Sequence, residues 1–214
     1  MIKALLNTNA HRWFAPLPFV IVAIAISMGS AQAAGDAEAG KAKAAACAGC
    51  HGTDGKGLAP GQPNLAGQNA NYLAKQLREY KSGERANAIM AGMAASLQTD
   101  QDIEDVAAFY ASLPPIEGVA EEEDLQRGTD IYRGGISSAG IPACSGCHGA
   151  NGNGNPAAGW PALSGQQAEY TKIQLEAFRS KARANDSNAM MRGIAERLTD
   201  AEIAAVANFI MGLH

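Results

Sequence analysis

Two copies of one short motif decide the fold of this chain. The first is Cys47-Ala-Gly-Cys50-His51-Gly52, and the second is Cys144-Ser-Gly-Cys147-His148-Gly149, which begins 97 residues later. Together they contain all four cysteines of the 214-residue sequence. The same two thiols and the same imidazole therefore occur twice with the same spacing, which indicates a chemical site that the chain builds twice.

The spacing Cys-x-x-Cys-His is typical of covalent attachment of c-type haem. Both sulfurs reach the vinyl-derived carbons on one porphyrin edge, and the adjacent histidine then lies beneath the iron. The alternatives are a disulfide, a thioredoxin-like site and a zinc site. A disulfide gives the histidines no role. A thioredoxin-like site requires a strand–helix setting, and a zinc site requires a fourth ligand. We therefore predict two haems, attached through Cys47, Cys50, Cys144 and Cys147, with His51 and His148 as iron ligands.

The similarity between the two halves extends outward from the motifs. Pro63-Asn-Leu-Ala-Gly-Gln68 returns as Pro161-Ala-Leu-Ser-Gly-Gln166, 98 residues later. Further pairs in the same order are Tyr72 and Tyr170, Gln76 and Gln174, Thr99 and Thr199, and Phe109 and Phe209. A period near 100 residues is too long for a solenoid and indicates a duplicated domain.

A linker is expected between the copies. Pro114-Pro115 stiffens the chain there, and the acidic run from Glu121 to Asp124 keeps the following segment solvated. We predict a first domain over 34–113, a linker over 114–120 and a second domain over 121–214.

The residue patterns predict helices and no strands. A helix is expected from about Asp36 into the first motif, and another from about 123 to 132 precedes the second. Glycine-rich loops then lead to helices over about 72–81 and 168–180. The last helix of each copy begins at a capping threonine, and Thr199, with Glu202 three positions on, is expected to form the better capping box. Each domain is thus all-α with long loops, which need a cofactor to fill the centre.

The repeat also selects the sixth ligand of each iron. Aligning Met90-Ala-Gly92 with Met191-Arg-Gly193 places methionine in both copies. The neighbouring methionines then face isoleucines, Met93 opposite Ile194 and Met190 opposite Ile89. Methionine is more often a core residue, but its repetition favours ligation by Met90 and Met191. His214 lacks a counterpart and is expected at the surface.

Methionine–histidine coordination limits what the irons can do. It raises the reduction potential and fills both axial positions, so peroxide, nitrite and oxygen have no site to bind. We therefore predict an electron-transfer protein, not an enzyme, with no small-molecule substrate. A ligating histidine normally donates its other ring N–H to an acceptor, and the carbonyls of Pro63 and Pro161 are the expected acceptors. A positive charge at Arg192 would raise the second potential if this side chain points inward.

The first 33 residues are typical of a secretory signal peptide. Basic residues precede an apolar run from Trp13 to Met28, and Ala31-Gln32-Ala33 is a small-residue cleavage site. The run is shorter than the ~20 residues of a membrane span. Cleavage after Ala33 leaves 34–214 with a net charge of 15 − 21 = −6. An acidic exported protein is a poor candidate for nucleic-acid binding, and the periplasm is its predicted location.

These motifs resemble the cytochrome c4 family of two-haem class I cytochromes c over essentially all of 34–214. The resemblance includes the start Ala34–Gly40, the Leu-x-Gly-Gln segments around Gly67 and Gly165, the insertion beginning at Arg133, and the ending Gly212-Leu-His214. It implies two tandem class I cytochrome c-like domains related by a pseudo-twofold axis, with the haem propionates close together at their interface. It also implies His51, Met90, His148 and Met191 as axial ligands.

The same resemblance implies an exported carrier, soluble or loosely membrane-associated, between a quinol-oxidising cytochrome bc complex and a terminal oxidase. The main alternative is an electron-accepting subunit of a flavin-linked sulfide dehydrogenase, since such two-haem subunits are similar. A two-haem peroxidase needs an open axial site and is disfavoured by the methionines. The family pattern further implies that Gly40 packs against Phe109 and Gly128 against Phe209. The segment from Lys81 to Ile89 is shorter than in many relatives.

Overall fold

The computed structural model describes residues 35–214, so the predicted signal segment and its cleavage site lie outside the described residues. Within 35–214 the chain is helical, and its only β-type pairings are isolated bridges between Ile136 and Ile141 and between Asn155 and Trp160. The all-α prediction is confirmed. None of the described helices combines the length and the apolar character that a membrane crossing requires.

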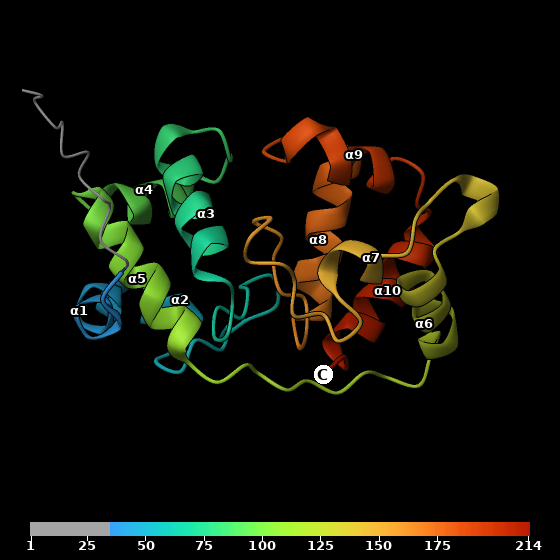
Figure 1. Cartoon of the computed structure of the whole chain (residues 1–214), viewed down its shortest axis with the longest axis horizontal. Helices are drawn as coiled ribbons and strands as arrows, with labels where there is room; N and C mark the ends of the chain where they lie inside the picture. Colours follow the sequence, from blue (N-terminus) through green and yellow to red (C-terminus); the bar gives the residue numbers. More distant parts are fainter. Residues whose placement is uncertain (1–34) are drawn as a thin grey trace, which may run out of the picture. The chain divides into compact units, whose positions relative to one another are not determined.

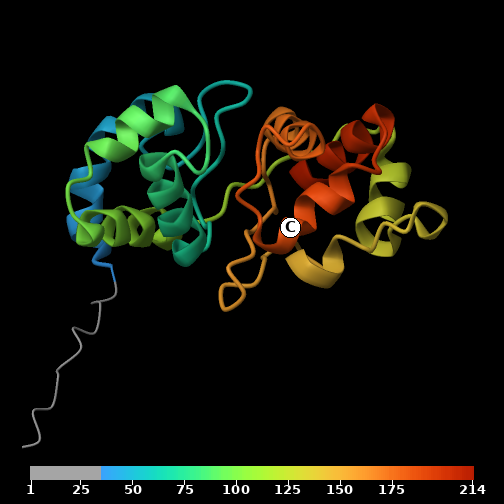
Figure 2. The same ribbon diagram turned by 90° about the horizontal axis from the view of Figure 1, so that it is seen from above.

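Five helices lie in each copy of the repeat (Figure 1). The first copy holds α1 (Ala37–Lys43), α2 (Ala48–His51), α3 (Ala70–Ser82), α4 (Ala88–Ala95) and α5 (Asp100–Ser112). The second holds α6 (Leu125–Gly134), α7 (Ser145–His148), α8 (Ala168–Arg179), α9 (Met190–Ala195) and α10 (Asp200–Met211). Seen from above, one extended segment joins the two groups of helices (Figure 2). The predicted helices exist, with ends shifted by a few residues.

Glycine sets the close approach of the first and last helix in each half. A Cβ atom added to Gly40 would lie 1.9 Å from the Asp105 carbonyl oxygen and 2.9 Å from the Phe109 Cβ. One added to Gly128 would lie 2.2 Å from the Ala205 oxygen and 2.8 Å from the Phe209 Cβ. The two expected glycine–phenylalanine contacts are therefore confirmed, and in both halves the helices cross in backbone contact.

Each half has one tyrosine in its hydrophobic core, but the two tyrosines lie on different helices of the crossing. In the first half Ala44 follows α1 and Tyr110 lies on α5, both buried. In the second half the positions are exchanged, with Tyr132 on α6 and Ile210 on α10. The tyrosine thus lies on α5 in the first half and on α6 in the second, and the second pair is the larger because isoleucine stands opposite its tyrosine instead of alanine.

The helix ends differ from the sequence prediction at two places. Thr99 forms a full capping box as well, because the Asp102 side chain accepts a hydrogen bond from the Thr99 amide while the Thr99 hydroxyl accepts one from the Asp102 amide. Aspartate therefore completes the first capping box as glutamate completes the second. The helix predicted from 123 begins at Leu125, because Asp124 adopts a left-handed conformation with φ 56°.

Candidate functional site

Each motif histidine is held by a proline carbonyl. His51 ends α2 and is buried, and its Nδ1 lies 3.0 Å from the Pro63 oxygen. His148 ends α7, and its Nδ1 lies 3.0 Å from the Pro161 oxygen. A carbonyl oxygen only accepts hydrogen bonds, so Nδ1 carries the proton and the Nε2 lone pair is left for a metal. The expectation for Pro63 and Pro161 is confirmed.

Burial favours the form of both histidines that binds a metal. It lowers the pKa of His51 and of His148, and the hydrogen bond that each imidazole donates to its proline carbonyl acts in the opposite direction. The neutral imidazole is the ligand form. Both halves thus favour a neutral imidazole with its proton on Nδ1.

The motif cysteines lie on the same helical turn as their histidine. The His51 amide donates to the Cys47 carbonyl at 3.0 Å, and the His148 amide donates to the Cys144 carbonyl at 2.9 Å. Residues three and four positions apart share one helix face, so both sulfurs and the imidazole are presented together. None of the four cysteines, all of which lie within 35–214, forms a disulfide. Two thiols and an imidazole with a free Nε2 lone pair, all on one helical turn, fit a covalently attached haem with a proximal histidine.

The candidate methionines are half-buried on short helices. Met90 lies on α4, where the Asn87 side chain accepts a hydrogen bond from the Met90 amide at 2.9 Å and caps the helix. Met191 is on α9. The equivalent residues Ile89 and Met190 are 74% and 41% exposed. Their shared exposure supports the alignment that pairs Met90 with Met191.

The segment before Met191 is built differently from that before Met90. Asn188 and Ala189 both adopt left-handed conformations, with φ of 53° and 56°. Such values are uncommon for residues other than glycine. The first half reaches its methionine through a capped helix start instead. The second half therefore reaches Met191 through a tight turn at Asn188 and Ala189 that has no counterpart before Met90.

Arg192 does not carry a free charge toward a haem. Its Nε lies 2.7 Å from the Asp186 carboxylate, which also accepts a hydrogen bond from the Arg192 amide at 3.0 Å. Because Asp186 offsets the guanidinium charge, Arg192 presents no uncompensated positive charge, and its effect on the second potential stays a prediction. His214 is exposed, as expected.

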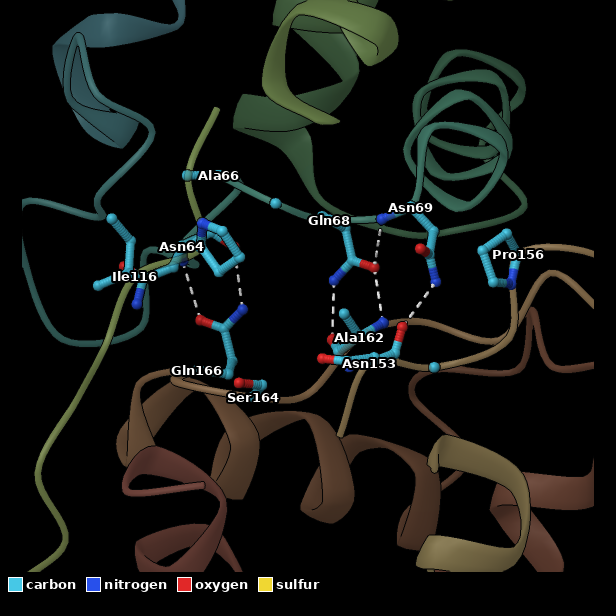
Figure 3. A pocket seen from close by; sticks show the side chains of 13 residues that line it. Asn64, Ala66, Gln68, Asn69, Ile116, Asn153, Pro156, Ala162, Ser164 and Gln166 are labelled. Atoms are coloured by element: carbon cyan, nitrogen blue, oxygen red, sulfur yellow. Dashed lines mark hydrogen bonds between the residues drawn. The ribbon is translucent and has the colours of Figure 1, made fainter. Parts of the chain in front are cut away.

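The two halves bind each other through reciprocal glutamine contacts (Figure 3). The side chain of Gln68 accepts from the Ala162 amide and donates to the Ala162 carbonyl, both at 2.8 Å. Gln166 makes the same pair of bonds to the backbone of Asn64, both at 2.9 Å. Gln68 and Gln166 are equivalent in the repeat, so the contact has twofold character. A cavity of about 320 Å³ lies beside these residues.

Comparison with known proteins agrees with this geometry. The family profile of Cytochrome c matches residues 37–114 and 126–214. Cytochrome c4 of Azotobacter vinelandii is 46% identical over 87% of this chain and 93% of its own length. The crystal structure of reduced recombinant cytochrome c4 from Pseudomonas stutzeri superposes with a TM-score of 0.82 at 44% identity, covering 85% of this chain and all of that one. A thiosulfate dehydrogenase electron acceptor of Stutzerimonas stutzeri is 41% identical over 78% of each chain.

The matches cover both halves and most of the relatives' length. They establish two class I cytochrome c domains in tandem, each with covalently bound haem c. The chain belongs to the cytochrome c family and, within it, to the cytochrome c4 group of two-haem electron-transfer proteins, which are not enzymes.

Proposed function

We propose that this cytochrome carries single electrons in the periplasm, from a quinol-oxidising cytochrome bc complex to a terminal oxidase. The observation that carries the proposal is the His–Pro contact at 3.0 Å, which occurs in both halves and orients each Nε2 for a metal. The proposal includes export of the protein with removal of residues 1–33. It also includes a first domain over 34–113, a linker over 114–120 and a second domain over 121–214.

The proposed haem sites use the motif residues and the paired methionines. Cys47 and Cys50 attach the first haem, and His51 and Met90 are its axial ligands. The second haem is attached in the same way through Cys144 and Cys147, with His148 and Met191 as its iron ligands. When bound, the haem iron supplies a one-electron couple, and methionine ligation raises its potential. The chain holds the imidazoles neutral through burial and fixes their orientation through the proline carbonyls.

Ligand variants test the assignment. The mature protein should contain two covalent haems by mass spectrometry. Its oxidised form should show the near-infrared sulfur-to-iron band, which Met90→Ala and Met191→Ala should each reduce by half. Met93→Leu and Met190→Leu are matched controls that should keep the full band. A single haem would contradict the cysteine assignment, and loss of band in Met93→Leu would show that the repeat alignment is wrong in the first half.

A second candidate role is delivery of electrons from the oxidation of a sulfur compound. It is supported by the relative named as a thiosulfate dehydrogenase electron acceptor. The flavin-linked sulfide dehydrogenase subunit considered from the sequence is a related alternative. Stopped-flow reduction of the purified protein by a bc complex, and by a thiosulfate or sulfide dehydrogenase, separates these roles. Fast reduction by the dehydrogenase alone would overturn the first proposal.

A further inference from the structure

One buried tyrosine of the first half has a hydroxyl without an ordinary partner. Tyr110 lies on α5 and is 2% exposed. No nitrogen or oxygen within residues 35–214 forms a hydrogen bond with its hydroxyl. A buried hydroxyl that lacks a partner costs free energy comparable to a lost hydrogen bond. The Tyr110 hydroxyl therefore needs an acceptor other than the oxygens and nitrogens around it.

The sulfur of Cys47, the first cysteine of the first motif, is the neighbour of this hydroxyl. Cys47 packs against the hydrophobic cluster that contains Tyr110. Burial raises the pKa of the Cys47 thiol, whereas hydrogen bonds from its own backbone amide and from the Tyr110 hydroxyl act in the opposite direction. Burial also raises the pKa of Tyr110, and Cys47 raises it further. Such mutual effects require the hydroxyl and the sulfur to lie close together.

The second half uses its core tyrosine differently. Tyr132 lies in the cluster against which Cys144 packs, but its hydroxyl donates to the Gly149 carbonyl at 2.7 Å. Burial raises the pKa of Cys144 to about 11, without a hydrogen bond from Tyr132. The residue equivalent to Tyr110 is Ile210, which has no polar side-chain group. Of the two halves, the first alone thus keeps a tyrosine hydroxyl free for its cysteine sulfur.

Haem attachment makes the Cys47 sulfur a suitable acceptor. A cysteine sulfur bonded to a haem carbon is a thioether, which has lone pairs but no hydrogen. It accepts hydrogen bonds weakly and donates none. The Tyr110 hydroxyl has a hydrogen to donate, so the two groups are complementary once the haem is attached.

We propose that the Tyr110 hydroxyl donates a hydrogen bond to the thioether sulfur of Cys47 and thereby raises the reduction potential of the first haem. The proposal rests on the haem sites assigned above. Because the sulfur is bonded to the porphyrin edge, a donor to it withdraws electron density from the haem and directs the positive end of the O–H dipole toward it. Both effects favour the reduced state. Tyr110 is thus a positioning residue that acts through Cys47.

The first test is Tyr110→Phe in the two-haem protein, which removes the hydroxyl and keeps the ring. A redox titration followed by NMR of the haem methyl groups measures the two potentials separately. The first potential should fall by roughly threefold in the equilibrium constant, or about 30 mV for a one-electron couple, and the second should not change. Tyr132→Phe is the matched control and should leave the first potential unchanged, because its hydroxyl donates to a carbonyl oxygen.

Resonance Raman spectroscopy tests the hydrogen bond itself. The phenol hydrogen is exchangeable, so the thioether C–S stretching mode should shift between H₂O and D₂O. Tyr110→Phe should reduce this shift, and Tyr132→Phe should keep it. Replacement of Tyr110 by 3-fluorotyrosine keeps the shape and makes the hydroxyl a stronger donor, so it should raise the first potential. This second variant decides the matter if Tyr110→Phe does not fold.

The outcomes separate this proposal from the haem assignment. Two covalent haems with unchanged potentials in both Tyr110 variants would overturn the hydrogen bond and leave the haem sites intact. A lower first potential in Tyr110→Phe with an unchanged isotope shift would show an effect of packing alone and would also overturn it. A protein without a thioether at Cys47 would contradict the haem assignment, and the role of Tyr110 would fail with it.

Discussion

The close helix crossing predicts different effects of substitution at two glycines on one helix. Gly128 and Gly134 are both in α6, and neither has a positive φ. A Cβ atom on Gly128 would lie 2.2 Å from the Ala205 oxygen, whereas one on Gly134 would have nothing within 4 Å. Alanine at these two positions therefore adds the same methyl group to the same helix in opposite environments.

The expected effects have opposite signs. Ordinary contact begins near 3.4 Å, so Gly128→Ala forces α6 and α10 apart by roughly 1 Å, and overpacking of this kind costs about 1–3 kcal/mol. Gly134→Ala instead gains up to about 1 kcal/mol, because alanine loses less backbone entropy in a helix. For a domain of this size, ~2 kcal/mol corresponds to roughly 10 °C in Tm.

Urea and thermal unfolding of the two-haem protein, followed by circular dichroism, measure both variants. Hydrogen exchange should locate the loss of Gly128→Ala in α6 and α10, with α1 and α5 protected as in wild type. Equal stability of the two variants would refute the backbone-contact account of the crossing, as would a Gly128→Ala protein more stable than wild type.

Two further differences between the halves predict unequal behaviour. Hydrogen bonds from Lys43, from the Asp36 amide and from Gln101 lower the pKa of Asp105 to about 2. This stabilisation is therefore present above about pH 4 and is lost as the pH falls toward 2; Asp105→Asn should flatten that part of the urea-midpoint profile, and an unchanged slope would contradict the assignment. Tyr132→Phe should cost about 1 kcal/mol because its hydroxyl donates to the Gly149 carbonyl at 2.7 Å. Tyr110→Phe should cost less in the same unfolding assay, because no nitrogen or oxygen among the described residues pairs with the Tyr110 hydroxyl and its neighbour is the Cys47 sulfur, a weak acceptor; the reverse order would argue against this account of the two cores.

The structural roles of residues that recur in both copies could be predicted from the sequence. The motif histidines, Pro63 and Pro161 recur in register, so one structural role implied the other. Gly40 and Gly128 could be paired with their phenylalanines through the family resemblance. Local chemistry was also readable, since a capping threonine fixes a helix start through bonds to residues three positions away.

Contacts between distant residues that carry no sequence signal could not be predicted. Arg192 has Asp186 as its partner only because the turn through Asn188 and Ala189 brings the Arg192 backbone amide and side chain to one carboxylate. A cluster of two buried arginines was missed as well. Arg85 and Arg183 occupy equivalent positions of the repeat, but nothing in either copy indicates that their guanidinium groups share acceptors across the interface.

The halves match around the candidate irons and differ around the cluster in which Arg85 and Arg183 both donate to Gln76 and Gln174. His51 and His148 have the same acceptor at the same distance, so identical axial ligands would give the two haems similar intrinsic potentials. The charge of Arg192 is offset by Asp186, which weakens its expected effect on the second potential. At the interface, however, α3 carries Lys75 and the buried Glu79, whereas the equivalent residues of α8 are Ile173 and Ala177. A charged pair on one side of an otherwise symmetric cluster acts unequally on the two haems, so α3 would be a second source of unequal potentials beside Tyr110, and neither involves an axial ligand.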